Sequence, residues 1–170
     1  MGFKVSWIGF DGIGKTEVLQ SAGLQDTGEP DEATEAPFSG AEIPGGWFIL
    51  FANDFDFVSR KRLARLSVDC RIVACQVHEG VMVSAAYGYE RGNRVWEIAH
   101  DGQRGTNDLS VVGSPPPSFE SIRRRLTQEQ EAEAGDVDYI FDIPVEVAAA
   151  ICNYRHDRWG IARFTRLAAR

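Results

Sequence analysis

Short runs of mainly apolar residues, separated by turn sequences, are clearest between residues 71 and 112. Such runs bounded by turn signals are typical of β-strands, and they predict strands over residues 71–78, 81–90, 93–100 and 108–112. Turn sequences at Glu79-Gly80 and Arg91-Gly92-Asn93 separate the first three of these strands. Strands joined by such short turns pair antiparallel. This region is therefore predicted to form an antiparallel meander, with Tyr89 opposite Trp96 if Gly92-Asn93 is the centre of the second turn.

Two further strands are predicted near the start of the chain. The segment Phe3–Trp7 alternates apolar and polar side chains, which predicts a strand with one face toward solvent. The run Trp47–Ala52 is almost entirely apolar and predicts a more deeply buried strand. With the meander, these segments predict an antiparallel sheet of about five strands.

Helices are predicted on both sides of the meander in the sequence. A short helix over Glu17–Gln20 is expected to end at Gly23, because glycine readily adopts the left-handed conformation that terminates helices. A second is expected over Phe57–Leu66. Two more follow the meander and begin near the capping residues Ser118 and Asp142. The predicted fold class is therefore α+β, with an antiparallel sheet flanked by helices.

Two segments differ from the rest of the chain in charge. Residues 24–46 carry six acidic residues and no lysine or arginine, and three prolines interrupt them, which predicts a long solvated loop. Residues 158–170 alternate arginines with apolar residues, which predicts a basic amphipathic helix that either docks on the domain or binds a partner. We therefore predict a single domain over residues 1–157 and a C-terminal tail over 158–170.

Composition narrows the classes of function. The formal net charge of −7 and the isoelectric point near 5.0 are atypical of nucleic-acid-binding proteins. The three cysteines include no C-x-x-C pair, which favours a reducing, cytoplasmic environment over a disulfide framework. No apolar run is long enough to span a membrane. A cytoplasmic protein without membrane contact is expected.

Residues 9–16 match the phosphate-binding loop pattern G-x-x-x-x-G-K-T. In a nucleotide site, backbone amides beside Gly9 and Gly14 would hold phosphates, Lys15 would reach the outer phosphates, and Thr16 would bind Mg²⁺. The pattern requires a buried parallel strand before the loop and a substantial helix after it. The alternating strand and short helix predicted here fit that context poorly, so nucleotide binding is retained as an alternative.

The histidines of the meander suggest a second alternative. His78 and His100 end strands that flank the same middle strand, so both lie at one edge of the sheet, and two-residue turns would place them on one face. With Asp101 nearby, one histidine could act as a general base in a hydrolase-type reaction. Asp136 and Asp138 form a D-x-D pattern, which we interpret as the polar face of a short strand. We expect no metal and no cofactor.

Three stretches carry a resemblance to a known family. They are Phe38–Trp47 (FSGAEIPGGW), Val81–Gly102 (VMVSAAYGYERGNRVWEIAHDG) and Asp138–Ala148 (DYIFDIPVEVA). They resemble a small bacterial family of single-domain proteins without an assigned activity, over most of residues 3–157. The resemblance implies a bacterial, cytoplasmic protein and transfers no site residue.

The function expected from these observations is binding of another protein. An acidic cytoplasmic domain without a recognisable catalytic motif resembles, by class and charge alone, the immunity proteins that neutralise toxins. We therefore expect a non-catalytic protein-binding domain. The hydrolase-type enzyme and the nucleotide binder remain the alternatives.

Overall fold

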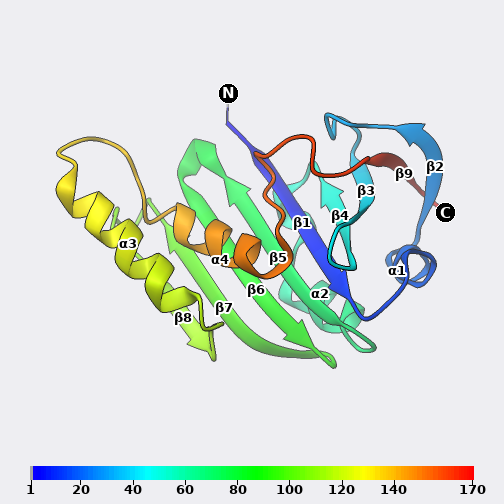
Figure 1. The fold of residues 1–170 in the computed structure, drawn as a ribbon, viewed down its shortest axis with the longest axis horizontal. Coiled ribbons are helices and arrows are strands. Elements are labelled where there is room, and N and C mark those ends of the chain that lie inside the picture. Colours follow the sequence, from blue (N-terminus) through cyan, green and yellow to red (C-terminus); the bar gives the residue numbers. More distant parts are fainter. Residues whose placement is uncertain (1) are drawn as a thin grey trace.

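The computed structural model describes residues 2–170. Within them, nine strands form one sheet in which every neighbouring pair is antiparallel (Figure 1). In spatial order the strands are β2 (Leu24–Pro30), β9 (Thr165–Ala169), β3 (Phe38–Ile43), β4 (Trp47–Ala52), β1 (Lys4–Asp11), β5 (Arg71–His78), β6 (Val83–Glu90), β7 (Asn93–Asp101) and β8 (Ser110–Gly113). The α+β class and the antiparallel sheet are confirmed, whereas the expected number of about five strands is wrong.

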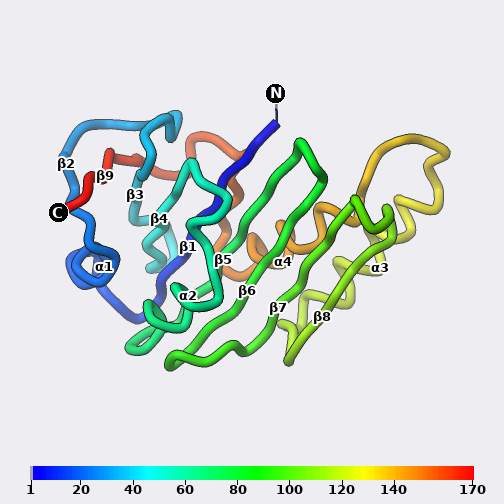
Figure 2. The backbone as a smooth tube through the Cα atoms, turned by 180° about the vertical axis from the view of Figure 1, so that it is seen from behind, coloured from blue at the N-terminus to red at the C-terminus, as the bar shows by residue number. Residues whose placement is uncertain are grey.

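Helices cover both faces of the sheet. On one face lie α3 (Phe119–Ala132) and α4 (Asp142–Cys152), and on the other lie α1 (Lys15–Ala22), α2 (Arg60–Leu66) and the single-turn 3₁₀ helix η1 (Phe55–Phe57). Figures 1 and 2 show the two layers from opposite sides. Each layer buries its own hydrophobic core against the sheet, so the molecule has three layers and two cores.

The central strand β1 shows why both faces must be covered. Val5 and Trp7 enter the core beneath α4, and Ile8 and Phe10 enter the core beneath α1 and α2. Alternate residues of a strand point to opposite faces, so the alternation in the sequence was correct. The solvent-facing side predicted for this strand is wrong, because Ser6 is also fully buried and donates a hydrogen bond of 2.7 Å to the backbone carbonyl of Asp54.

The meander forms where it was predicted, but its register differs by one residue. The turn is centred on Arg91-Gly92 rather than on Gly92-Asn93, and a bulge near Val95 then shifts the pairing of β6 with β7 by one residue, so that Gly88 rather than Tyr89 lies opposite Trp96. A one-residue shift turns side chains to the other face of a sheet. A Cβ atom on residue 88 would lie 2.1 Å from Nε1 of Trp96. The indole therefore occupies the space that a side chain at residue 88 would need.

The acidic segment 24–46 is ordered into strands rather than a loop. It contains β2 and β3, and Asp31 organises the connection between them. The Asp31 carboxylate accepts hydrogen bonds from the backbone amides of Glu35 and Ala36, each at 3.0 Å, and from the hydroxyl of Ser39. Burial alone would raise the pKa of Asp31, but these hydrogen bonds outweigh burial and lower it. An acid that looked solvated in the sequence is thus a buried structural group.

The C-terminal tail forms a strand, so the predicted helix is wrong. β9 lies between β2 and β3, and its Leu167 is buried in the core beneath α1 and α2. The Arg166 guanidinium lies 3.8 Å from the Glu29 carboxylate, and the Arg170 side chain donates to the carbonyl of Leu24 at 2.9 Å. The basic tail therefore docks on the acidic segment of its own chain and completes the sheet.

Candidate functional site

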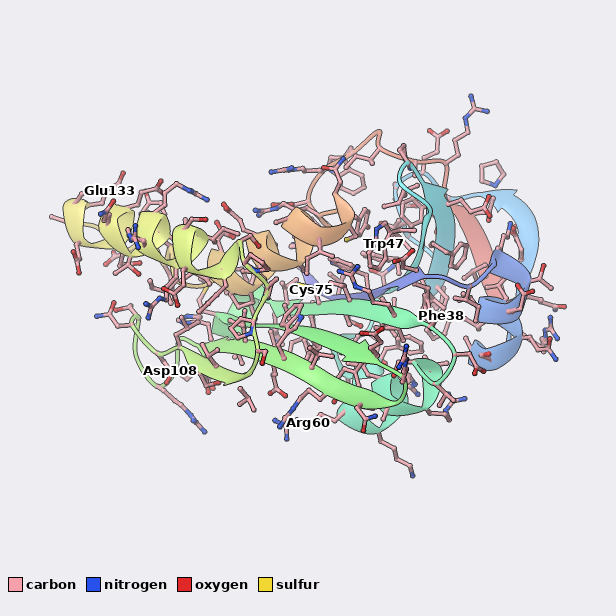
Figure 3. All side chains as sticks on the ribbon, turned by 60° about the horizontal axis from the view of Figure 1, so that its bottom comes forward. Phe38, Trp47, Arg60, Cys75, Asp108 and Glu133 are labelled. Atoms are coloured by element: carbon pink, nitrogen blue, oxygen red, sulfur yellow. The ribbon has the colours of Figure 1, made fainter. Side chains whose placement is uncertain are left out.

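His100 is almost completely enclosed, with 1 % of its surface exposed. Its Nδ1 lies 2.6 Å from the backbone carbonyl of Asp108, and its Nε2 lies 2.8 Å from Oδ2 of Asp138. Asp108 belongs to the loop that joins β7 to β8 (Figure 3). Both ring nitrogens are therefore engaged by oxygen atoms of the protein. The ring holds two loops to the end of β7 and has no free nitrogen for a substrate.

Asp138, from the D-x-D pattern, completes this arrangement. Its second carboxylate oxygen accepts a 3.1 Å hydrogen bond from the backbone amide of Phe141, next to the start of α4. Residues 137–141 form no strand, so the predicted strand there is wrong. The signal for this role in the sequence is an aspartate three residues before Phe141, the residue that precedes α4.

The structure does not bring His78, His100 and Asp101 together. The His78 ring packs on Phe55 of η1, with ring centroids 5.8 Å apart, whereas His100 faces Phe141 beside α4. The two histidines therefore lie on opposite faces, and the predicted shared face is wrong. The cause is the register: His100 lies opposite Ser84, and His78 lies opposite Val83.

Asp101 makes hydrogen bonds and an ion pair within the loop that follows β7. Its carboxylate accepts a 3.0 Å hydrogen bond from the amide of Gln103 and lies 3.5 Å from the guanidinium of Arg104. Its backbone amide donates to the side chain of Asp108 at 3.2 Å. These contacts shape a turn, and none of them orients either histidine as a general base.

The phosphate-loop pattern lies in an antiparallel setting. Gly9 lies inside β1, which pairs antiparallel with β4 and β5. Gly14 precedes the eight-residue helix α1, and Thr16 on its first turn is exposed. The Lys15 ammonium forms an ion pair with the carboxylate of Asp26 in β2. A phosphate loop follows a parallel strand and leaves its lysine free for phosphate, so this geometry differs from that of a nucleotide site.

The two edges of the sheet differ in a way that the sequence analysis missed. The edge strand β2 contains Asp26, Glu29 and Pro30, which are residues that discourage pairing with another strand. The opposite edge strand, β8, reads Ser-Val-Val-Gly and has no charge or proline. All four residues of β8 are exposed, with Val111 at 41 % and Val112 at 40 %. The short apolar run was visible in the sequence, but its position at an edge was not.

A second feature missed by the sequence analysis is a small pocket beside His156, in the loop between α4 and β9. His156 is 4 % exposed, and neither of its ring nitrogens has a hydrogen-bond partner in the described part of the chain. Its ring packs edge-on against Phe3, with centroids 4.8 Å apart. Burial lowers the pKa of His156, reinforced by the nearby Arg155 and opposed by Asp157 and Glu79.

Arg155 fixes this loop beside α4. Its guanidinium donates to both carboxylate oxygens of Asp157, at 2.9 and 3.0 Å, and lies 3.5 Å from Asp142 and 3.9 Å from Glu146. Burial raises the pKa of Asp142, although Arg155 opposes the rise. Because His156 follows Arg155 directly, the same contacts hold the imidazole in the pocket wall.

The remaining chemistry-bearing side chains are structural. Cys70, Cys75 and Cys152 are buried, and burial raises the pKa of Cys70 and of Cys152 to about 11. Few thiolates then form near neutral pH. Cys75 lies in the core between the sheet and α4 (Figure 3). Among residues 2–170, no three His, Cys, Asp or Glu side chains are grouped as metal ligands would be.

Comparisons with known proteins add no relative. No protein-family model, no curated protein and no solved structure matches this chain. No helix among residues 2–170 is both long and apolar enough to cross a membrane.

Proposed function

We propose that this chain is a non-catalytic protein-binding domain that pairs an extended segment of a partner protein with β8. The main support for this proposal is the contrast between the two edges of the sheet. An unpaired edge presents backbone N–H and C=O groups that another strand can use. Charge, proline and an irregular register protect β2, whereas β8 presents none of these features.

Exposed apolar side chains extend the proposed surface beyond β8. Val95, on β7 next to the bulge, is 41 % exposed, and its carbonyl accepts a 3.0 Å hydrogen bond from the amide of Ser114 just after β8. Val95, Val111 and Val112 thus lie on the two outermost strands at this edge. Alternating side chains of an added strand could pack on these valines while its backbone pairs with β8.

The net charge favours a basic or neutral partner segment. A formal charge of −7 attracts basic proteins at low ionic strength. This agrees with the expectation of a domain that masks a partner, in the manner of immunity proteins by class. The hydrolase and nucleotide alternatives receive less support, because His100 is enclosed by acceptors and Lys15 is paired with Asp26.

The test compares charges added at the two edges. The variant Val111→Lys/Val112→Lys places two lysines on β8, and the matched control Gln25→Lys/Thr27→Lys adds the same charge to exposed positions of β2. The tagged full-length chain would be used to capture proteins from its native cells at low salt, followed by mass spectrometry and by measurement of the Kd for each purified partner.

We expect a stoichiometric partner whose affinity falls at least tenfold in the β8 variant and is unchanged in the β2 variant. Bound partner should also slow amide hydrogen exchange at residues 110–113. Equal loss of affinity in both variants, or a clean bait with no partner, would overturn the proposal. Light scattering shows whether the partner is a second copy of the chain.

A further inference from the structure

We propose that the pocket beside His156 is a binding site for a primary ammonium group, independent of the partner surface at β8. The pocket lies between the loop that precedes β9 and the connection from β2 to β3. The groups that would contact the ligand are His156, Tyr154, Phe164, Trp159 and Glu32.

The imidazole gives the pocket an unused acceptor. A buried polar group normally has a hydrogen-bond partner, because leaving it unpaired costs free energy. His156 is more than nine-tenths buried, lines the pocket, and finds no partner among the described protein groups. In its neutral form the ring offers one lone pair, which an N–H donor can use.

The size of the pocket limits what can enter. The enclosed space is about 20 Å³, which accommodates one water-sized group. An ammonium group has that size, whereas a planar ring does not fit. The rest of a ligand would lie outside, against Trp159, whose side chain is 60 % exposed at the mouth.

Aromatic rings in the pocket wall favour a cation over an anion. Tyr154 and Phe164 are buried in the wall with ring centroids 5.8 Å apart, and aromatic faces attract cations. Glu32 is an exposed carboxylate on the lining. The other charged groups near His156 are the carboxylates of Asp157 and Glu79 and the guanidinium groups of Arg155 and Arg158. Asp157 is paired with Arg155, and on the lining the charge of Glu32 is offset by that of Arg158, so the preference for a cation comes from the aromatic rings and the lone pair of His156.

Two sources could supply the ammonium group, a free small amine or the side chain of a lysine. Two probes separate them: methylammonium chloride, and Nα-acetyl-lysine methylamide, whose aliphatic stem can also lie on Trp159. A ligand with so few atoms binds in the millimolar range at best. Each probe would be titrated into the full-length protein at constant chloride while NMR follows the indole N–H of Trp159 and the ring of His156.

We expect saturable shifts of both residues with methylammonium. Tighter binding of the lysine derivative would identify a protein side chain as the source, and binding of methylammonium alone would identify a free amine. His156→Phe keeps an aromatic ring but removes the acceptor and should weaken binding at least tenfold. Glu32→Gln should weaken it severalfold, whereas the matched control Glu35→Gln, which does not line the pocket, should not.

The proposal is overturned by any of three results. The first is the absence of a saturable shift with either probe at concentrations up to about 100 mM, well above the millimolar Kd expected. The second is an equal response to sodium acetate, which presents an anion of similar size. The third is unchanged affinity in both His156→Phe and Glu32→Gln. Because Glu32 is exposed, the glutamine variant remains a test even if His156→Phe fails to fold.

Discussion

The indole of Trp96 lies where a side chain on Gly88 would be, and this contact fixes the register of β6 against β7. A Cβ atom on residue 88 would approach Nε1 of Trp96 to 2.1 Å and its Cε2 to 2.5 Å. Trp96 is buried beneath the α3–α4 layer, so it has little freedom to move away. The bulge near Val95 places Trp96 opposite Gly88, and the absence of a side chain at residue 88 leaves room for the indole.

Replacement of Gly88 by alanine should destabilise the protein. Inserting a methyl group into a packed core costs about 1–3 kcal/mol. We expect a loss of this size in the free energy of unfolding measured with urea. Gly135→Ala is the control, because no heavy atom lies within 4 Å of the added Cβ. Equal stability of Gly88→Ala and the wild type would show that the indole moves easily.

Removal of the Asp138 carboxylate should be costly. Asp138→Ala removes an acceptor from Nε2 of the buried His100 and another from the amide of Phe141. Leaving buried groups unpaired costs about 2–4 kcal/mol. The matched control is Asp136→Ala, which removes the other carboxylate of the D-x-D pattern at an exposed position and should change stability by less than about 0.5 kcal/mol. Similar effects of both variants in urea unfolding would contradict the assignment.

Acidification should weaken the fold through His156. Burial lowers the pKa of His156 below its ordinary value of 6.5. Above that value the ring is neutral in both states and contributes no pH dependence. As the pH falls below it, the unfolded state takes up a proton that the folded state resists, so stability decreases until the folded pKa is reached.

The check is the unfolding free energy of the wild type and of His156→Phe at about pH 7.5 and about pH 5. The decrease on acidification should be smaller in the variant, and subtracting the two curves removes the contribution of other groups such as Asp142. An identical decrease in both proteins would show that His156 titrates alike in the folded and unfolded states.

We expect Lys15 to contribute to stability through its ion pair with Asp26 and not to bind nucleotides. The pair is partly exposed, so Lys15→Ala should cost less than about 1 kcal/mol. Asp26→Asn should have a similar effect. Mg-ATP and Mg-GTP should leave the melting temperature of the wild type unchanged. A rise in melting temperature with either nucleotide that Lys15→Ala abolishes would restore the nucleotide-binding alternative.

Local patterns identified most elements of the fold. The strand over residues 71–78, the strand Trp47–Ala52 and the helix end at Gly23 agree with the structure. Each of these depends on a signal within a few residues, namely continuous apolar character or a glycine in the left-handed conformation. Such signals act before any distant part of the chain is in place.

The candidate sites depended on long-range relations and were predicted poorly. The side of the sheet on which His100 lies depends on a bulge, and the partner of Lys15 comes from a segment that looked like a loop. The pocket beside His156 requires contacts between Phe3, the segment around Glu32 and the loop after α4. Residue spacing along the chain contains no information about these contacts.

The sequence by itself determined the α+β class, the antiparallel meander and the helices that flank it, because periodicity and capping are local properties. The tertiary structure alone decided that the tail is a strand. β9 is stabilised by pairing with β2 and β3 and by burying Leu167, and these partners lie more than a hundred residues away. The same arrangement leaves β8, which has no charge or proline, at an edge of the sheet, since only the completed sheet defines which strands are outermost.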